Sequence, residues 1–237
     1  MINKTLLILC LNEISGLKAI MPQIKKEWYD QLLVIDGGSS DGSIEWCKEN
    51  GYEVYVQKKR GFRHGYIEAW DLVKGKYVAC FSPDGNSIPE SIPEMFKKID
   101  EGYDLVIASR YLGNAKSEDD DIITGFGNWL FTKTVNLLYN GNFTDVMVIL
   151  RVFKKELIND LNLLSEDTYS LPEKLFFTKI SWEPIMSCRA AKMKKKITEI
   201  PFDEPKRIGG ERKLQIIRWG AAYYFQFIRE LWFWRKK

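Results

Sequence analysis

Short apolar runs alternate with stretches of helical periodicity along the first half of the chain. The apolar runs have strand length and cover residues 5–11, 31–35, 53–57, 77–81 and 104–109. Apolar runs of this length are typical of strands covered on both faces. Helical stretches occupy the intervals between them, at 15–28, 43–50, 65–73 and about 89–99, and we expect an irregularity at Pro22 in the first of them. The alternation predicts an α/β fold, a mostly parallel doubly wound, Rossmann-like sheet.

The polar loops that follow four of these strands carry the residues suited to chemistry. In doubly wound sheets, ligands bind beyond the carboxyl ends of the strands. The loops after Leu11, Ile35, Phe81 and Ser109 lie at those ends. We therefore expect one crevice to collect residues that are far apart in the sequence, namely Asn12, Glu13, Asp36, Asp84, Asn86 and Arg110.

The second half of the chain has a weaker pattern. A polar, acidic stretch at 113–121 is expected to be a mobile loop, and residues 128–139 are apolar at helical spacing. Shorter β-rich segments follow at 147–153 and 197–200. The pattern divides the chain into a main domain, residues 1–214, and a C-terminal amphipathic helix, residues 215–237.

Composition and charge narrow the possible classes of protein. The chain has 237 residues and a net charge of +3. Residues 186–237 contain 14 basic and 5 acidic side chains, so this end carries +9 and the rest of the chain −6. The basic end suggests an anionic partner, and its Trp, Tyr and Phe residues favour a lipid surface over nucleic acid. Four scattered cysteines and a single histidine argue against a disulfide framework or zinc site and favour the cytoplasm.

Asp84 and Asn86 are candidate ligands for a divalent cation. A carboxylate and an amide oxygen at a strand end suit Mg²⁺ or Mn²⁺. Alone, the Pro-Asp-Gly sequence around Asp84 is better explained as a turn. Its position at a strand end, in line with Asp36, favours the metal site.

Two other loops have a functional and a structural interpretation. Asp36 and the glycines after it could bind a base or ribose, or could form a loop that leads into a helix cap. Glu13 could accept from a ribose hydroxyl or be a solvated acid. The basic loop 207–213 could close over a diphosphate or be a solvated turn.

Six motifs occur in the order seen in family 2 glycosyltransferases, and the chain most resembles the dolichol- and polyprenol-phosphate sugar synthases. The resemblance covers most of residues 4–214. The motifs are CLNE (10–13), VIDGGSSDGS (34–43), FSPDGNSIPE (81–90), ASRYL (108–112), TDVMVILRVFKK (144–155) and EIPFDEPKRIGGERKL (199–214).

The resemblance implies a glycosyltransferase A (GT-A) fold, a UDP- or GDP-sugar donor, Mg²⁺ or Mn²⁺, and inversion at the anomeric carbon. The metal ligands would be Asp84 and Asn86. Arg110 and Arg151 would lie near a phosphate-bearing acceptor and, with Asp84 and Glu183, form the catalytic set. The implied donor-binding residues are Leu11, Asn12, Glu13, Asp36, Gly38, Arg60, Asp84, Arg207, Arg212 and Lys213.

The chain departs from the family pattern at three places. Ser82 replaces the first acid of Asp-x-Asp, which removes one carboxylate from the metal site. Gly37 stands where a second Asp is common, and the segment before Arg151 lacks the usual small residues. These departures bear on the donor and the acceptor more than on the fold.

The acceptor decides whether the reaction needs a base. A polyprenyl phosphate is already anionic and needs none, whereas a sugar hydroxyl of a soluble glycan or polysaccharide precursor does. Glu183 lies roughly where many family 2 enzymes carry a catalytic acid, but it could simply be a carboxylate at a helix start beside Pro184. A third alternative is a nucleotide-binding module without catalysis, suggested by Ser82.

The C-terminal segment has an apolar stripe flanked by basic residues. From Ile216 to Trp234 the stripe has helical spacing, and Trp219, Trp232 and Trp234 suit a headgroup boundary. We expect a helix that holds the enzyme on an anionic membrane, peripheral on the cytoplasmic inner face, near a lipid-linked acceptor. The alternative is a helix packed on the domain or on another subunit of a homo-oligomer.

Overall fold

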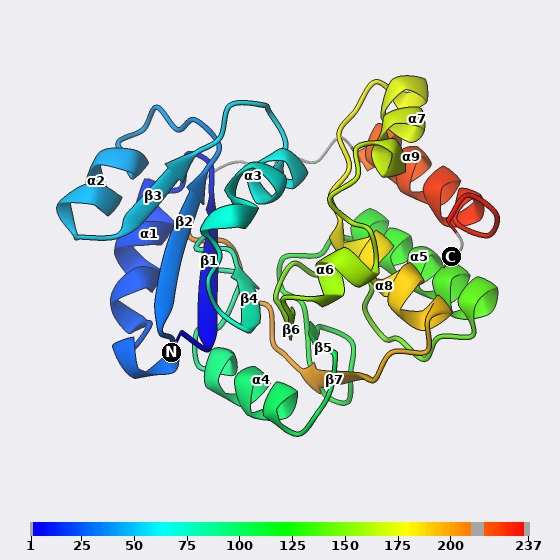
Figure 1. Cartoon of the computed structure of the whole chain (residues 1–237), viewed down its shortest axis with the longest axis horizontal. Helices are drawn as coiled ribbons and strands as arrows, with labels where there is room; N and C mark the ends of the chain where they lie inside the picture. The colour runs from blue at the N-terminus through cyan, green and yellow to red at the C-terminus, as the bar shows by residue number, and fades with distance from the viewer. Residues whose placement is uncertain (1, 210–215, 235–237) are drawn as a thin grey trace.

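A twisted sheet with helices on both faces forms the centre of the molecule in the computed structural model, which describes residues 2–209 and 216–234 (Figure 1). Within those residues the strand order is β3-β2-β1-β4-β6-β5-β7. The strands are β1 (Lys4–Cys10), β2 (Gln31–Asp36), β3 (Glu53–Val56), β4 (Tyr77–Phe81), β5 (Leu105–Ser109), β6 (Arg151–Lys154) and β7 (Ile197–Pro201). The α/β class and the mostly parallel sheet are therefore confirmed.

Strand β6 is the exception to the parallel arrangement. It pairs antiparallel with β4 on one side and β5 on the other. It is also shorter than the β-rich segment 147–153, because Asp145 accepts hydrogen bonds from the amides of Met147 and Val148 and turns the chain there. Residues 147–150 consequently leave the sheet and line a cavity.

The first helices fill the intervals that the sequence pattern assigned to them. The expected helix 15–28 is instead α1 followed by two short 3₁₀ helices, because Pro22 at the start of the first of these lacks the amide that an α-helix needs. The elements are α1 (Ile14–Ile20), η1 (Met21–Gln23), η2 (Lys26–Trp28), α2 (Ser43–Glu49), α3 (Phe62–Ala69), η3 (Trp70–Leu72) and α4 (Ser91–Asp100).

The helices of the second half gather at one end of the sheet, on the right of Figure 1. Helix α5 starts six residues before the expected 128, because Asp121 and Thr124 form a reciprocal capping box at its first turn. The elements are α5 (Ile122–Tyr139), α6 (Leu157–Asp160), α7 (Asp167–Phe176), α8 (Glu183–Lys192) and α9 (Ile216–Arg229).

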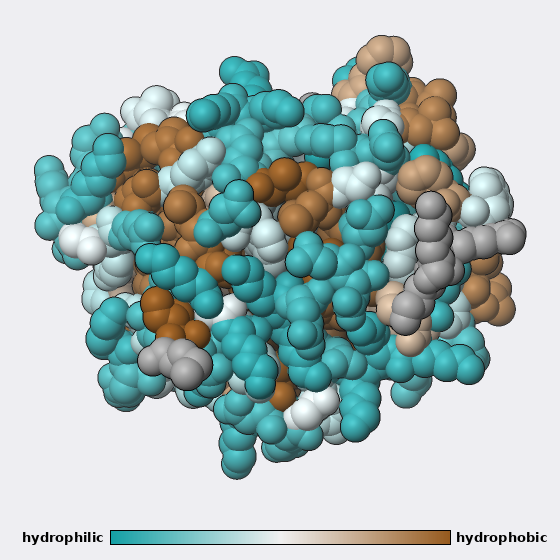
Figure 2. Space-filling model, viewed as in Figure 1, coloured by the Kyte–Doolittle hydropathy of each residue, from teal (hydrophilic) through white to brown (hydrophobic). Residues whose placement is uncertain are grey.

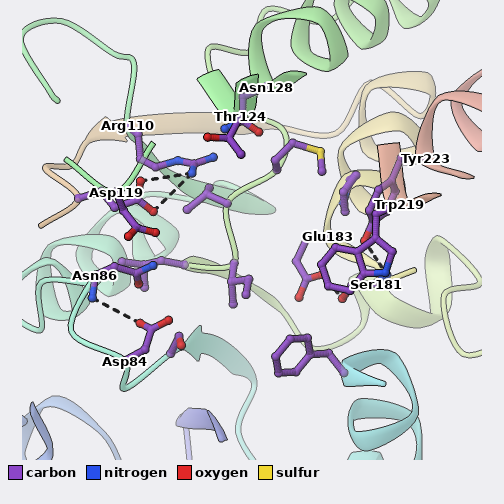
Figure 3. Close-up of a pocket in the computed structure, with 18 of the residues that line it drawn as sticks. Asp84, Asn86, Arg110, Asp119, Thr124, Asn128, Ser181, Glu183, Trp219 and Tyr223 are labelled. Carbon is purple, nitrogen blue, oxygen red and sulfur yellow. Dashed lines mark hydrogen bonds and ion pairs between the residues drawn. The ribbon is translucent and has the colours of Figure 1, made fainter. Parts of the chain in front are cut away.

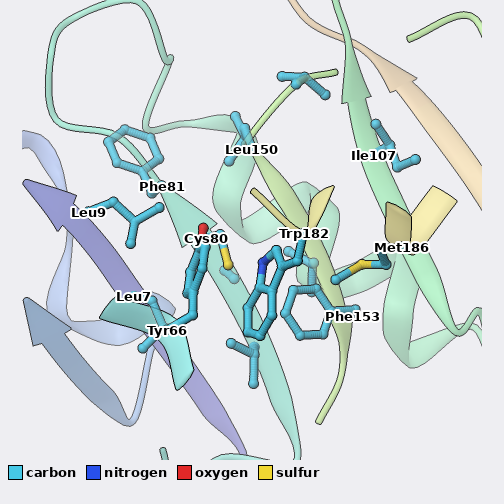
Figure 4. Packing of buried hydrophobic residues seen from close by; sticks show 14 of the residues in the cluster. Leu7, Leu9, Tyr66, Cys80, Phe81, Ile107, Leu150, Phe153, Trp182 and Met186 are labelled. Atoms are coloured by element: carbon cyan, nitrogen blue, oxygen red, sulfur yellow. The ribbon is translucent and has the colours of Figure 1, made fainter. Parts of the chain in front are cut away.

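An aromatic cluster joins the two halves of the chain (Figure 4). Trp182, directly before α8, is fully buried and stacks on Tyr66 of α3 with ring centroids 4.1 Å apart. Trp70 and Phe153 meet the same indole edge-on. Such pairs add about 0.5–1.5 kcal/mol each beyond burial. The start of α8 is thereby fixed against the sheet.

The C-terminal helix packs on the domain, as the alternative interpretation held, and contacts α5, α7 and α8. Tyr223 and Phe227 of the apolar stripe are buried there, whereas Tyr224 and Leu231 of the same stripe are 37% and 39% exposed, so part of the stripe that was expected to face a membrane packs on the domain instead. Glu230, just beyond α9, forms a fully buried ion pair with Arg189 of α8, with Nη2 and Oε1 2.8 Å apart. The expected boundary near 215 falls outside the described residues.

Two further observations bear on the cellular compartment of the protein and on its relation to a membrane. Cys10, Cys47, Cys80 and Cys188 are all buried and free. Within residues 2–209 and 216–234, no helix is both long and apolar enough to cross a membrane.

Candidate active site

A cavity of about 390 Å³ lies beyond the carboxyl ends of β1, β4, β5 and β7. In Figure 3, Asp84, Asn86, Arg110 and Asp119 lie on one side of it, with Ser181, Glu183, Trp219 and Tyr223 across from them. The cavity brings together several residues that the sequence predicted to meet. They are Leu11, Asp84, Asn86, Arg110, Glu183 and Arg207.

Asp84 is the buried acid of the charged side. It is 5% exposed, and loss of hydration raises the pKa of its carboxyl, an effect that the charge of Arg207 partly offsets. The backbone amide of Asn86 lies 3.4 Å from its Oδ1. Gly85 between them has φ of +91°, and an added Cβ would meet Ile208, so the turn needs glycine where the later loop crosses it.

Arg207 bridges two segments over this turn. Its Nη1 lies 3.1 Å from Asp84 Oδ2, and its Nη2 lies 3.8 Å from Asp119 Oδ2. The amide of Ile208 donates to the carbonyl of Asp84 at 2.8 Å, which fixes the chain there. Arg212 and Lys213, the other predicted residues of this loop, lie outside the described residues.

Arg110 is held by two acids at the end of β5. Its Nε and Nη2 donate to Asp145 at 2.6 and 3.0 Å, and Nη1 lies 3.4 Å from Glu204. Burial lowers the pKa of Arg110, but Asp145 and Glu204 outweigh it and raise the value overall. Asp145 thus fixes the direction of the guanidinium, a role that the sequence did not reveal although the motif 144–155 contains this residue.

The acidic stretch expected to be a mobile loop is tied to the segment after β7. Ser117 forms a parallel bridge with Glu204, and the amides of Glu118 and Glu204 bond to carbonyls across it. Asp119 and Asp120 of this stretch line the cavity. Their contribution was not foreseen, because the pattern gave no sign that the stretch returns to the strand ends.

The Asp36 loop lies at the edge of the cavity. The Asp36 carboxylate accepts from the amides of Gly38 and Ser39 at 2.8 and 2.7 Å, and from the Ser39 hydroxyl. Asn12 Oδ1 accepts from the amide of Ser40, which joins this loop to the end of β1. The carboxylate therefore organises the loop, while Gly37 and Leu11 face the cavity.

Three other donor-site candidates lie near the same edge but not among the described lining residues. Glu13 is buried, and its amide donates to the Ser43 hydroxyl. Gly38 has φ of +89°, which forms the turn after Asp36. Arg60 is exposed, and its carbonyl lies 2.6 Å from His64 Nδ1.

Glu183 lines the cavity from the first turn of α8. It is 1% exposed. Tyr66 donates to its Oε1 at 2.8 Å, and the Ser181 hydroxyl donates to Oε2. The carboxylate is consequently held in one orientation beside the cavity, and it is also the helix-start acid that the alternative interpretation described.

Arg151 is separated from the cavity, contrary to the expected contact with the acceptor. It is 0% exposed. Its Nη1 donates to the carbonyl of Glu183 at 2.7 Å and its Nη2 to that of Val148 at 2.7 Å. The side chain faces inward and holds the cavity-lining segment against α8, so it is a positioning residue.

The side away from Asp84 is formed by α5 and α9. Lining residues from these helices are Ile123, Thr124, Gly127, Asn128, Phe131, Trp219, Gly220 and Tyr223. Tyr223 accepts from the amide of Ser181 at 2.7 Å, which ties α9 to the loop before Glu183. The C-terminal helix is therefore part of the cavity wall, a role that its amphipathic pattern alone did not indicate.

The family model for glycosyl transferase family 2 matches residues 5–161. The chain is 26% identical over 220 residues to glycosyltransferase AglJ of Haloferax volcanii, covering 92% of this chain and 68% of that protein. It is 23% identical over 240 residues to an undecaprenyl-phosphate mannosyltransferase of Micrococcus luteus, covering 92% and 94%.

A solved structure shows the same fold. Glucosyl-3-phosphoglycerate synthase of Mycobacterium tuberculosis, crystallised with Mn²⁺, UDP and phosphoglyceric acid, superposes with a TM-score of 0.67 at 15% identity. The match covers 98% of this chain and 79% of that one. From the family match, the sheet order and the cavity at the strand ends, we conclude that the chain belongs to glycosyl transferase family 2 and is a nucleotide-sugar-dependent glycosyltransferase of the GT-A fold.

Proposed function

We propose that this enzyme transfers a sugar from a UDP- or GDP-sugar to a polyprenyl phosphate, with Mg²⁺ or Mn²⁺ bound at the donor diphosphate. The observation that carries the proposal is the division of the cavity. Asp84, Asn86 and Arg207 lie together at one end of the cavity, and α5 and α9 contribute the apolar side chains of Ile123, Phe131 and Trp219 to its wall. A charged donor and a lipid-linked acceptor need these two environments side by side.

The donor side fits a divalent cation. Within the described part of the chain, no three His, Cys, Asp or Glu side chains form a metal cluster. Magnesium in nucleotide sites needs only one or two carboxylates, together with substrate phosphates and water. Asp84 would hold the cation, with Asn86 as a second oxygen ligand. Such a cation would neutralise the departing diphosphate.

The protein's own residues hold and orient the substrates. Asp36 and Glu13 lie at the edge expected to receive the nucleoside, and the loop that Asp36 organises carries the lining residue Gly37. Arg110 projects its guanidinium from the end of β5, already oriented by Asp145. An acceptor phosphate held beside it needs no general base, so catalysis would depend on alignment with the anomeric carbon.

The acceptor side opens toward helices with exposed apolar side chains. On α5 the spacing of Ile122, Phe126, Trp129 and Leu137 makes one stripe, and these side chains are 54–93% exposed. Neighbouring exposed residues on α7 and around α9 include Leu171, Leu175, Phe177, Ile217, Ile228 and Trp232. Figure 2 shows brown atoms gathered where α7 and α9 lie.

Exposed apolar surface of this extent favours a lipid interface. Lys133, Lys174 and Arg218 are exposed on the same three helices and suit anionic headgroups. We therefore propose that this face lies on the cytoplasmic side of the membrane, where the prenyl chain stays in the bilayer and its phosphate reaches the cavity.

The test is transfer of labelled sugar to undecaprenyl phosphate in anionic vesicles. A thermal-shift panel of UDP, GDP, CDP and TDP sugars with Mn²⁺ first selects the donor. We expect label in the lipid extract, none with undecaprenol as acceptor, and none with the Asp84→Asn variant. Absence of lipid-extracted label with every stabilising donor would contradict the proposal.

A sugar hydroxyl is the second candidate acceptor, favoured by the position of Glu183. Its carboxylate is buried at the cavity, with Tyr66 and Ser181 fixing both oxygens. A carboxylate so placed could take the proton of an attacking hydroxyl. The acceptor assay with Glu183→Gln distinguishes the two candidates.

A further inference from the structure

The cavity holds two carboxylates that share one guanidinium. Asp84 follows β4, and Asp119 belongs to the acidic stretch before α5. Arg207 Nη1 lies 3.1 Å from Asp84, and its Nη2 lies 3.8 Å from Asp119. A positive charge thus already lies between two acids that come from distant parts of the sequence.

Asp119 supplies a second carboxylate near Asp84, through the guanidinium that the two acids share. Ser82 stands in place of the first acid of the Asp-x-Asp motif. Asp119 is held near Asp84 by the bridge between Ser117 and Glu204. The two acids together fit the one or two carboxylates that Mg²⁺ and Mn²⁺ use alongside phosphate oxygens.

Arg207 is less firmly bonded than Arg110, which also lines the cavity. Its Nε is buried without a hydrogen-bond partner in the described residues, and its side chain is 22% exposed. Arg110, in contrast, makes two short bonds to Asp145, at 2.6 and 3.0 Å. The guanidinium of Arg207 can therefore leave its acids at lower cost, particularly if a diphosphate offers it stronger acceptors.

We propose that, before the donor binds, the Arg207 guanidinium occupies the position of the divalent cation between Asp84 and Asp119. Binding of the donor together with its cation would replace the guanidinium at that position. Arg207 would then hold the diphosphate oxygens, and Asp84 and Asp119 would hold the cation, which would supply charge neutralisation for that diphosphate. This proposal rests on the proposed function, since it names how the donor side of that site loads. It assigns Asp119 as the acid that compensates for Ser82.

The exchange is tested by Mn²⁺ binding, measured by electron paramagnetic resonance titration without any turnover. Wild-type protein is titrated with Mn²⁺ alone and with UDP present. The variants are Arg207→Gln, Asp119→Asn and both together, with Lys206→Gln as the matched control. Lys206 is the neighbouring exposed cation and does not line the cavity. Thermal unfolding of each variant verifies that it is folded.

We expect Arg207→Gln to bind Mn²⁺ alone about tenfold more tightly than wild type, because a competing cation is removed. UDP should tighten Mn²⁺ binding to wild type and much less to Arg207→Gln. Adding Asp119→Asn should cancel the gain of Arg207→Gln, and Lys206→Gln should match wild type.

Equal Mn²⁺ affinity of Arg207→Gln and wild type would overturn the proposal, as would a gain that survives Asp119→Asn. These results are independent of lipid transfer. If the polyprenyl phosphate is not the acceptor, the expected results of the Mn²⁺ titrations do not change. If Arg207 does not exchange with the cation, the expected result of the lipid transfer assay does not change.

Discussion

Replacing Glu230 by Ala should lower the free energy of unfolding, because it removes the buried partner of Arg189. Both side chains are 0% exposed. Arg189 Nε and Nη2 donate to the two Glu230 oxygens at 2.9 and 2.8 Å. The remaining bonds of this guanidinium, to the carbonyls of Leu161 and Asn162 and to the hydroxyl of Thr168, would stay. The substitution thus leaves a buried cation without its counter-charge.

Breaking such a buried pair costs about 3–5 kcal/mol. For a chain of this size that corresponds to a melting temperature lower by very roughly 6–20 °C. Urea unfolding followed by circular dichroism gives the free energy of unfolding. The slope of this free energy against urea concentration should be the same in the variant and in wild type. Arg218→Ala, on the exposed side of α9, is the control and should stay within about 0.5 kcal/mol of wild type.

The double variant Arg189→Met with Glu230→Leu should recover most of the loss, since two apolar side chains can replace a buried ion pair. A loss below about 1 kcal/mol for Glu230→Ala at unchanged slope would refute the reasoning. It would mean that the C-terminal helix is not docked on α8, and the interpretation of α9 as a membrane helix would regain support.

Four further predictions concern the site and its surroundings. Asp84→Asn should abolish Mn²⁺-dependent donor binding by calorimetry yet raise stability at neutral pH. The raised pKa of Asp84 means that its ionised form destabilises the fold, so this gain should vanish at acid pH where wild type is protonated. Glu183→Gln should change transfer to a lipid phosphate less than about threefold and reduce transfer to a sugar hydroxyl by about 10²–10⁴; loss of both activities would contradict the phosphate acceptor. Arg151→Lys should cost about 2–4 kcal/mol in urea unfolding, because an ammonium cannot bond all the buried carbonyls; a stable variant that has lost activity would instead restore its catalytic role. Phe126→Asp with Trp129→Asp should reduce sedimentation with anionic liposomes by about tenfold without changing stability, since both side chains are more than half exposed; unchanged sedimentation would count against this membrane face.

The strands and most helices could be predicted because their signals are local. A strand buried on both faces is mostly apolar, so β1, β2 and β4 are visible as nearly continuous apolar runs. The rule that ligands bind at the ends of such strands then predicted the meeting of Asp84, Asn86 and Arg110. Pro22 signalled that the first helix is interrupted, but where the chain then goes depends on packing.

The different positions of Arg110 and Arg151 could not be predicted from local sequence. Arg110 directly follows β5 and Arg151 begins β6, two strands that pair with each other. Both looked equally suited to an acceptor phosphate. The antiparallel insertion of β6 turns Arg151 into the core, where carbonyls satisfy it, while Arg110 faces the cavity. The order of strands in a sheet depends on residues far apart in the chain, so no short segment of sequence could distinguish the buried arginine from the one that faces the cavity.

By itself the sequence determined the α/β architecture, the family pattern and the acids at the strand ends, because periodicity and turn chemistry act over a few residues. The tertiary structure decided which charges meet and what the C-terminal helix covers. An amphipathic stripe gains the same hydrophobic free energy against a bilayer or against a protein core. The buried side chains of Tyr223 and Phe227 show that this part of the stripe in α9 packs on the core.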